Sequence, residues 1–280
     1  MNKGQKNTKI KRILKITNVL VSQPKPVKTD GNPYVMLAEK LKLNLDFRQF
    51  IKVEGVSFKE YRAQHLNLPD FTAVVFTSKV GIDTYFKIAK EIKFQVPEDM
   101  LYFCSTEAIA LYLQKYIIFR KRKIFYGKKT VSDLTDTFKK HSDAKTLVVQ
   151  SDVSTDEIPK FLDKLKIFHK EIVLYKTVSA DLSDIKSEFE KYQLLVFFTP
   201  AGIRSLKENF PDWKQSEVKI AAFGDSTQEE VKKLGYNLDI EAPTPENPHL
   251  PSLELKELVV VFSAAVLVPG ILHSPVSFLS

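Results

Sequence analysis

The chain has 280 residues, of which 44% are apolar, enough for roughly two domains with buried cores. This composition excludes a disordered or fibrous protein, and a formal charge of +8 with a pI near 9.2 favours an anionic partner. The single cysteine, Cys104, excludes a disulfide framework and a multi-cysteine metal site, and five scattered histidines argue against a histidine metal cluster.

The chain begins with a basic segment that does not have the pattern of a secretion signal. Residues 1–16 are rich in Lys and Arg but lack the apolar core of about 7 to 15 residues that a signal peptide needs. We therefore expect a solvated basic lead-in and a protein of the reducing cytoplasm.

Short apolar runs, rich in β-branched and aromatic residues, then alternate with helical patterns, which is typical of βαβ units. Helices are predicted at residues 106–116 and 226–234, where a Ser or Thr precedes or opens the helix. Because several strands are continuously apolar, we expect parallel sheets covered by helices on both faces. The predicted strands are 18–22, 44–47, 72–76, 100–104, 123–126, 146–150, 171–175, 194–198, 219–223 and 238–240.

Near the end of the chain, residues 258–268 form an apolar run that is shorter than the roughly 20 residues of a membrane-spanning helix. The run either docks on the last domain as a strand or helix, or packs poorly. A membrane-surface role is disfavoured, because the run has no polar face of the kind that an interfacial helix shows. Residues 252–280 carry no functional prediction.

A weak internal repeat predicts two lobes of like topology. Residues 72–82 match residues 194–203 if one position is gapped before the glycine. Further on, Thr106 and Thr227 each open a helix, about 121 residues apart. Since any α/β protein repeats strand–turn–helix units, a coincidental match also remains open.

The order of the segments indicates that the first lobe is discontinuous. We expect residues 1–50 and 172–258 to form the first α/β lobe, residues 51–171 the second, and residues 259–280 an atypical apolar tail. Crossings near residues 50–56 and 175–178 would make a two-stranded hinge beside a ligand-binding cleft. The predicted fold class is α/β, with two similar parallel-sheet lobes joined by a two-stranded hinge.

Hydroxyl-bearing turns follow many of the predicted strands and are candidate anion receptors. At the carboxyl ends of parallel strands, backbone N–H groups and the helix dipole favour carboxylates or phosphates. Each hydroxyl could instead serve only as a helix N-cap. The candidates are Ser22, Gln23, Thr77, Ser78, Ser105, Thr106, Ser151, Thr199, Ser226 and Thr227.

No familiar catalytic motif occurs, and Tyr175 is the most promising single residue. The chain has no nucleophile elbow, phosphate loop, dinucleotide fingerprint or zinc-protease motif. Tyr175 ends an apolar strand at the predicted hinge, where its phenol either donates a hydrogen bond into the cleft or packs in the core. We expect Cys104 to be a small strand-end residue, and residues 120–123 to be a solvated basic loop rather than a nucleic-acid site.

The order and spacing of these segments, over residues 19–245, point to a known family. The segments are Phe76-Thr77-Ser78 with a following Gly-Ile, the helix opening at Ser105-Thr106, Tyr175 to Thr177, Phe198 to Gly202, and Phe223 to Thr227. Together they resemble uroporphyrinogen-III synthase. Residues 22–26 and 242–246 are most similar to the branch found in Bacteroidetes-type bacteria.

The resemblance implies a two-lobed, monomeric enzyme of tetrapyrrole synthesis without a metal or other cofactor, and without nucleic-acid or membrane partners. Its substrate would be hydroxymethylbilane, a linear tetrapyrrole polyanion that closes with loss of water and inversion of ring D. Tyr175 would assist departure of the hydroxyl, as proton donor or through water. The resemblance adds Lys25, Thr177, Pro200, Ala201 and Gly202 to the substrate-binding candidates.

The chain departs from the family pattern at some positions. Many relatives have an arginine after the first strand, where this chain has Gln23 and Lys25, and Asp225 would repel an anion.

Two other functions share the predicted fold. A non-enzymatic binding module for a small anionic metabolite would use the cleft but not Tyr175 chemistry. A flavodoxin-like electron carrier would hold a flavin phosphate in the hydroxyl-rich turns.

Overall fold

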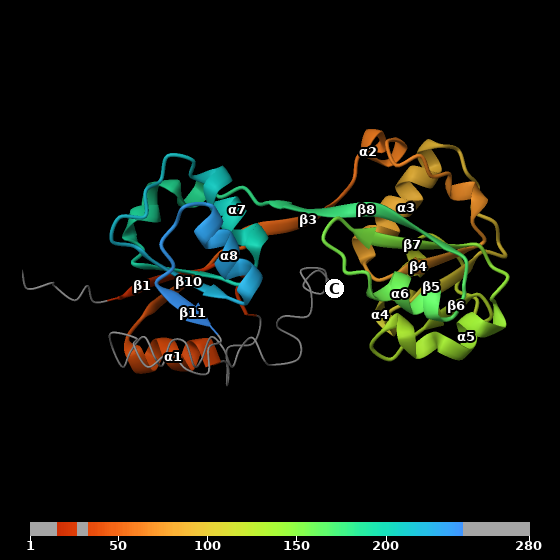
Figure 1. The fold of residues 1–280 in the computed structure, drawn as a ribbon, viewed down its shortest axis with the longest axis horizontal. Helices are drawn as coiled ribbons and strands as arrows, with labels where there is room; N and C mark the ends of the chain where they lie inside the picture. The colour runs from red at the N-terminus through yellow and green to blue at the C-terminus, as the bar shows by residue number, and fades with distance from the viewer. Residues whose placement is uncertain (1–15, 27–32, 243–280) are drawn as a thin grey trace, which may run out of the picture. The chain divides into compact units, whose positions relative to one another are not determined.

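The computed structural model describes residues 16–26 and 33–242, which divide into two α/β units (Figure 1). The first unit combines the described residues up to Phe50 with those from Ala180 onward, and the second is Ile51–Ser179. The tail predicted at residues 259–280 lies outside the described residues. Each unit is built around a mainly parallel sheet, so the predicted α/β fold class is confirmed.

The first unit contains five parallel strands in the spatial order β11-β10-β9-β1-β2. The strands are β1 (Asn18–Val21), β2 (Asn44–Phe47), β9 (Leu194–Phe197), β10 (Lys219–Phe223) and β11 (Ile240–Ala242). The helices are α1 (Pro33–Leu41), the 3₁₀ helix η4 (Ser183–Lys191), α7 (Pro200–Asn209) and α8 (Asp225–Lys233). Because the strands are parallel, their carboxyl ends meet at one edge of the sheet.

The second unit contains six strands in the order β3-β8-β7-β4-β5-β6, and only β3 is antiparallel to its neighbour. The strands are β3 (Ile51–Gly55), β4 (Ala73–Phe76), β5 (Leu101–Cys104), β6 (Ile124–Tyr126), β7 (Thr146–Ser151) and β8 (His169–Ser179). The α-helices are α2 (Phe58–Arg62), α3 (Lys79–Glu91), α4 (Glu107–Tyr112), α5 (Thr135–Lys140) and α6 (Glu157–Lys164). The 3₁₀ helices are η1 (Leu68–Asp70), η2 (Leu113–Lys115) and η3 (Val131–Leu134).

The two sheets hold equivalent strands in the same spatial order. The order β8-β7-β4-β5-β6 of the second unit corresponds strand by strand to β2-β1-β9-β10-β11 of the first. The helix that follows β4 is capped by Ser78 and the one that follows β9 by Thr199, each two residues after its strand. Ser78 and Gly81 therefore match Thr199 and Gly202 without a gap, and the gap predicted in the repeat is wrong.

The side chains of β4, a central strand of the second unit, point alternately into two cores, so this sheet is buried on both faces. Val74 and Phe76 belong to one core, together with apolar residues of α3, whereas Ala73 and Val75 belong to another, together with residues of α5 and α6. Successive side chains of a strand point to opposite faces, so a continuously apolar strand fills two cores.

Strand β3 was not among the predicted strands. It runs antiparallel beside β8 (Figure 1), with Ile51 opposite Ser179 and Gly55 opposite Tyr175. Its residues alternate between partly buried and exposed, which is a weaker signal than a continuous apolar run. Because β8 is one continuous strand, the second chain crossing follows Ser179, whereas the sequence placed the boundary after residue 171.

Two other predicted elements are displaced along the chain. The strand expected at residues 238–240 is β11, which begins at Ile240. The helix expected from Ser226 begins at Asp225, and its N-cap is Gly224. Gly224 has a φ of +83°, a conformation that glycine adopts without steric cost, so no hydroxyl is needed to start this helix.

Candidate active site

The carboxyl-end edge of the parallel sheet in the second unit carries many of the predicted receptors. β4, β5 and β7 are parallel and end at one edge of the sheet. β8 continues past this edge to Ser179, and its residue Tyr175 is paired with Ser151 at the end of β7. The predicted residues at this edge are Thr77, Ser78, Ser105, Thr106, Ser151, Tyr175 and Thr177.

Two of these hydroxyl groups are helix N-caps. The Ser78 hydroxyl accepts a hydrogen bond from the Val80 N–H at 3.2 Å, and the Thr106 hydroxyl accepts one from the Ile109 N–H at 3.4 Å. The cap function alone explains why a Ser or Thr stands at each position. The first turn of a helix has further N–H groups without an intrahelical partner, and these are the groups that favour an anion.

The phenol of Tyr175 forms a hydrogen-bonded pair with Thr77, and their oxygen atoms are 3.2 Å apart. Tyr175 is only 1% exposed. Burial raises the pKa of the Tyr175 phenol above its usual value; the Thr77 hydrogen bond opposes this rise, and the nearby Asp152 charge adds to it. The phenol is therefore protonated at neutral pH and has a proton to give.

The ring of Tyr175 packs directly on α3 because residue 81 is glycine. A Cβ atom at Gly81 would lie 3.0 Å from Val149 Cγ1 and 3.1 Å from Tyr175 Cε1. Val149 and Tyr175 are both buried, so neither has free space to move. The absence of a side chain at Gly81 thus allows the Tyr175 ring to contact the helix. The internal repeat aligned this glycine with Gly202, but the pattern gave no sign that it contacts a tyrosine.

The turn after β7 is tied to β8 by an aspartate that sequence reasoning missed. Asp152 Oδ1 accepts hydrogen bonds from the Ser151 hydroxyl at 2.9 Å and from the Thr177 N–H at 3.0 Å. The Asp152 N–H donates to the Tyr175 carbonyl at 3.2 Å. The Thr177 hydroxyl is buried and has no hydrogen-bond partner among the residues that the structure describes. Ser151, Tyr175 and Thr177 are thereby brought together.

The first unit carries the remaining predicted residues at the carboxyl edge of its own sheet. The Thr199 hydroxyl caps α7, which starts at Pro200, by accepting from the Gly202 N–H at 3.2 Å, and Ala201 lies in the same turn. Ser22 follows the neighbouring strand β1, and its hydroxyl would lie 3.7 Å from a Cβ atom at Gly202. Gln23 is buried, whereas Lys25 is exposed.

Ser226 and Thr227 are not helix caps as the Ser-Thr pattern suggested. Both lie inside the first turn of α8, after its Gly224 cap. The Thr227 side chain is 1% exposed and packs inward, whereas Ser226 is exposed. The sequence similarity between Thr106 and Thr227 therefore joins two positions with different structural roles.

Cys104 and the charged residues give no alternative catalytic centre. Burial raises the pKa of the Cys104 thiol to about 12, so it is protonated and unreactive at neutral pH. Within residues 16–26 and 33–242, no group of three His, Cys, Asp or Glu side chains could hold a metal ion. None of the helices in those same residues is long and apolar enough to cross a bilayer.

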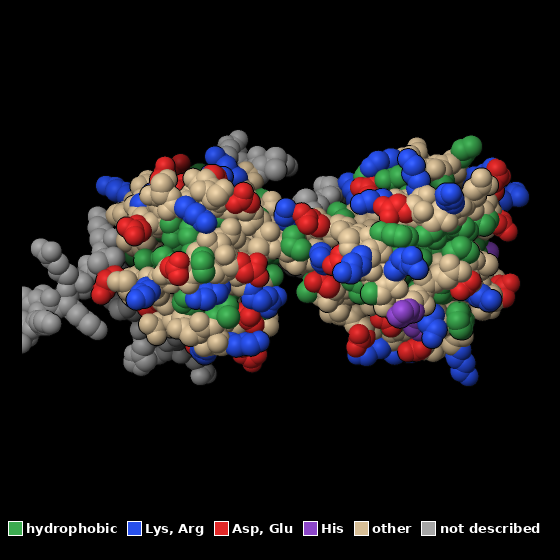
Figure 2. Space-filling model, turned by 90° about the horizontal axis from the view of Figure 1, so that it is seen from above, with side chains coloured by type: hydrophobic (Ala, Val, Ile, Leu, Met, Phe, Trp, Pro, Cys, Tyr) green, Lys and Arg blue, Asp and Glu red, His purple; other side chains and the backbone are tan. Residues whose placement is uncertain are grey.

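The positive charge of the chain is not concentrated on the face seen in Figure 2. Lys and Arg side chains are interspersed there with Asp and Glu on both units. On this face an anion would therefore meet mixed charges rather than one broad basic surface.

One family model matches most of the chain. The family model described as "Uroporphyrinogen-III synthase HemD" matches residues 35–251. No curated protein matches the chain. Among solved structures, uroporphyrinogen-III synthetase from Helicobacter pylori is similar with 15% identity and a TM-score of 0.46, covering 89% of this chain and 100% of that one. The uroporphyrinogen III synthase of Thermus thermophilus is similar with 13% identity and a TM-score of 0.40, covering 88% and 99%.

Proposed function

The chain belongs to the uroporphyrinogen-III synthase family, and from this premise we propose that Tyr175 and the receptors at the strand ends carry out its reaction. The protein is a cyclising lyase of tetrapyrrole synthesis, which closes hydroxymethylbilane with inversion of ring D and loss of water. Since this substrate closes unaided without inversion, the protein's main task is to hold one folded geometry.

The observation that supports this proposal is the buried pair of Tyr175 and Thr77. In the proposed first step the C–O bond of the substrate breaks, and its hydroxyl leaves as water with a proton from Tyr175, directly or through water. The resulting phenolate then takes back the proton that is lost when the ring closes. The Thr77 hydroxyl stabilises this phenolate because it can donate to it at the observed distance.

The carboxylate groups of the substrate would be received by the N-terminal turns that follow the strands. Ser78 and Thr106 in the second unit, and Thr199 in the first, order helix turns whose free N–H groups point away from the helix. The Thr177 hydroxyl, which is buried and has no hydrogen-bond partner among the described residues, is a further proposed contact. The other proposed contacts are Ser22, Gln23, Lys25, Ser105, Ser151, Pro200, Ala201, Gly202, Ser226 and Thr227.

The test uses Tyr175→Phe, which keeps the ring packed on Gly81 and removes only the hydroxyl. We expect a partial loss of the type III product, by roughly ten- to a hundredfold in turnover, because a general acid contributes about 10² to 10⁴ and water can substitute in part. The measurement supplies fresh hydroxymethylbilane, oxidises the products, and separates the type I and type III uroporphyrin isomers by chromatography.

The control is Thr77→Val, which keeps the Tyr175 hydroxyl but removes its partner. It should reduce turnover less than Tyr175→Phe does and leave the ratio of the isomers in favour of type III. Unchanged turnover in Tyr175→Phe would remove the tyrosine from the mechanism. A wild-type protein that is folded and yields only the type I isomer would instead indicate the binding module.

We also propose that the protein acts as a monomer in the cytoplasm, without nucleic-acid or membrane partners. One buried, reduced cysteine is compatible with that compartment. The ion pair of Arg120 with Glu98 supports a solvated loop in the basic run 120–123. Sedimentation of the purified protein at several concentrations, with and without duplex DNA, tests the monomeric state and the absence of DNA binding.

A further inference from the structure

The second unit has a cavity at the opposite edge of its sheet from Tyr175. It lies where the chain enters β5 and β6, because Met100 and Tyr102 border the start of β5 and Lys123 and Ile124 the start of β6. Its volume is about 180 Å³. That is room for a small molecule and too little for a four-pyrrole chain.

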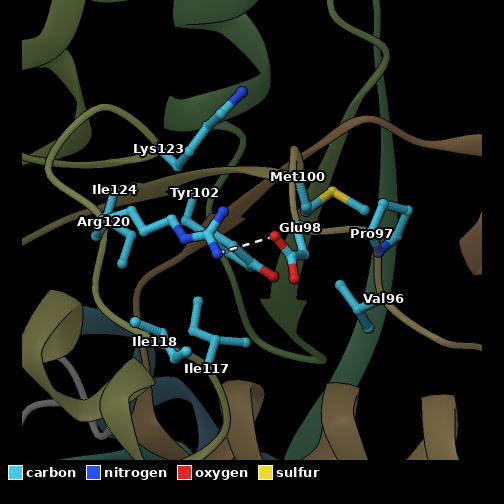
Figure 3. A pocket seen from close by; sticks show the side chains of 10 residues that line it. All are labelled: Val96, Pro97, Glu98, Met100, Tyr102, Ile117, Ile118, Arg120, Lys123 and Ile124. Carbon is cyan, nitrogen blue, oxygen red and sulfur yellow. Dashed lines mark ion pairs between the residues drawn. The ribbon is translucent and has the colours of Figure 1, made fainter.

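The walls of this cavity are largely apolar. Val96, Met100, Ile117, Ile118 and Ile124 contribute aliphatic side chains. In Figure 3, Ile117 and Ile118 lie on one side of the cavity and Met100 with Val96 on the other. Ile118 is 77% exposed, so a large apolar side chain stands in water at the site. An apolar ligand body would remove this surface from water.

The phenol of Tyr102 lines the same space, and Tyr102 is 3% exposed. Behind it in the core, Tyr85 is fully buried, and its hydroxyl has no hydrogen-bond partner within the described part of the chain. Both rings pack against Phe76. Burial raises the pKa of the Tyr102 phenol, so it remains a hydrogen-bond donor at neutral pH.

The charged groups at the cavity are predominantly positive. Arg120 Nη2 lies 2.8 Å from Glu98 Oε2, and the Glu98 side chain is 82% exposed. In Figure 3 the Arg120 guanidinium reaches across the cavity toward Glu98, beside the Tyr102 ring. Lys123 adds a second cation, and its ammonium donates to the Asp99 carbonyl at 3.3 Å. An exposed ion pair of this kind is weak, so a ligand carboxylate could take the place of Glu98.

From these observations we propose that the cavity is a second ligand site, separate from the reaction site, which binds a small apolar carboxylate about the size of benzoate. The carboxylate accepts hydrogen bonds from Arg120 and Tyr102, and the apolar body lies between the isoleucines and Met100. This site does not depend on the function of Tyr175, because it uses none of the same residues.

The experiment titrates the full-length protein with benzoate, and in parallel with benzamide, which has the same shape but no charge. Methyl resonances of Ile117, Ile118 and Met100 in NMR spectra report occupancy. We expect saturable shifts with benzoate and roughly tenfold weaker binding of benzamide, because hydrogen bonds to charged groups are about twice as strong as neutral ones.

Variants identify the groups that bind the carboxylate. Tyr102→Phe keeps the ring beside Phe76, and both it and Arg120→Gln should weaken benzoate binding by roughly tenfold. Arg122→Gln, in the same basic run but outside the cavity lining, should bind benzoate like the wild type. Absence of saturable shifts at these methyl groups would overturn the proposal. Equal affinities for benzoate and benzamide, or unchanged affinity in both Tyr102→Phe and Arg120→Gln, would also overturn it.

Discussion

The two units share a scaffold, but they differ in the one residue that lies between the end of an equivalent strand and the cap of the helix that follows it. β4 and β9 are each followed after two residues by a capping hydroxyl, Ser78 or Thr199. The intervening residue is Thr77 in the second unit and Phe198 in the first. Thr77 bonds to Tyr175, whereas the Phe198 ring stacks on Phe223, 4.9 Å away. The cap is thus common to both units, and the residue before it determines whether a hydroxyl stands at the edge to bond with another side chain.

The path of the chain between the two units follows the strand-by-strand correspondence of their sheets. It leaves the first unit just after β2 and the second unit just after β8, and these two strands occupy corresponding positions in their sheets. Apart from β3, the strands therefore form two consecutive and equivalent sets of five along the chain: β1, β2, β4, β5 and β6, and then β7 to β11. The first unit contains β1 and β2 from the first set and β9 to β11 from the second, and the second unit contains the other strands. In the second unit, β3 pairs with β8 at Tyr175, which surrounds this residue with backbone on both sides.

The largest expected difference between the units concerns the matched glycines Gly81 and Gly202. Gly81→Ala should destabilise the protein by about 1 to 2 kcal/mol, because overpacking against Val149 and Tyr175 outweighs the helix-propensity gain of about 1 kcal/mol. Gly202→Ala meets Phe197 only at 3.3 Å and should change stability by less than about 0.5 kcal/mol. Urea unfolding, followed by circular dichroism, measures both.

Two further readouts separate the units. Trp213, the single tryptophan of the chain, packs near Phe189 and Tyr236 and reports by fluorescence on the first unit. Gly81→Ala should leave this signal unchanged while lowering formation of the type III isomer. Equal destabilisation by the two glycine variants would contradict the assigned role of Gly81 in packing Tyr175.

A smaller effect is expected for the caps, which should be equivalent in the two units. Ser78→Ala and Thr199→Ala should each cost about 1 kcal/mol of stability, since each removes one side-chain acceptor at a helix start. The double variant should show additive costs, because the sites share no partner. Ser226→Ala, inside the first turn of α8, should stay within about 0.5 kcal/mol of the wild type. A cost for Ser226→Ala as large as for Thr199→Ala would contradict the cap assignment.

The smallest effect concerns acid stability in the second unit. Glu60 pairs with Lys176 and accepts from the Ser57 cap, and these contacts lower the pKa of its carboxyl from 4.5 to about 2. A lowered folded-state pKa stabilises the protein above about pH 4.5, and this contribution is lost as the pH falls toward about 2. Glu60→Gln keeps an acceptor for Ser57 but cannot ionise. Its unfolding free energy should therefore depend less steeply on pH in this window, and a slope identical to that of the wild type would remove Glu60 from acid stability.

Most strands could be predicted from the sequence, whereas the site could be predicted only in part. Residues 73–76 and 194–198 are apolar throughout. A short continuous apolar run between helical patterns is typical of a strand that is buried on both faces. β3 was missed because its side chains alternate between partly buried and exposed and form no continuous apolar run. The Thr77 and Tyr175 hydroxyls were named separately, but their pairing across 98 positions depends on the order of the strands. Asp152 was missed because its role depends on a register shift between β7 and β8.

The sequence by itself determined the α/β class, the two-unit organisation and the family, because apolar periodicity, turn residues and motif order are local properties of the chain. Tertiary structure decided that Thr106 is a helix cap whereas Thr227 is not, that Gly81 contacts a tyrosine, and that the phenol of Tyr175 is buried and paired. Those properties arise from strand order and from the contact of α3 with Val149 and Tyr175, and such long-range packing leaves no periodic signal in the sequence.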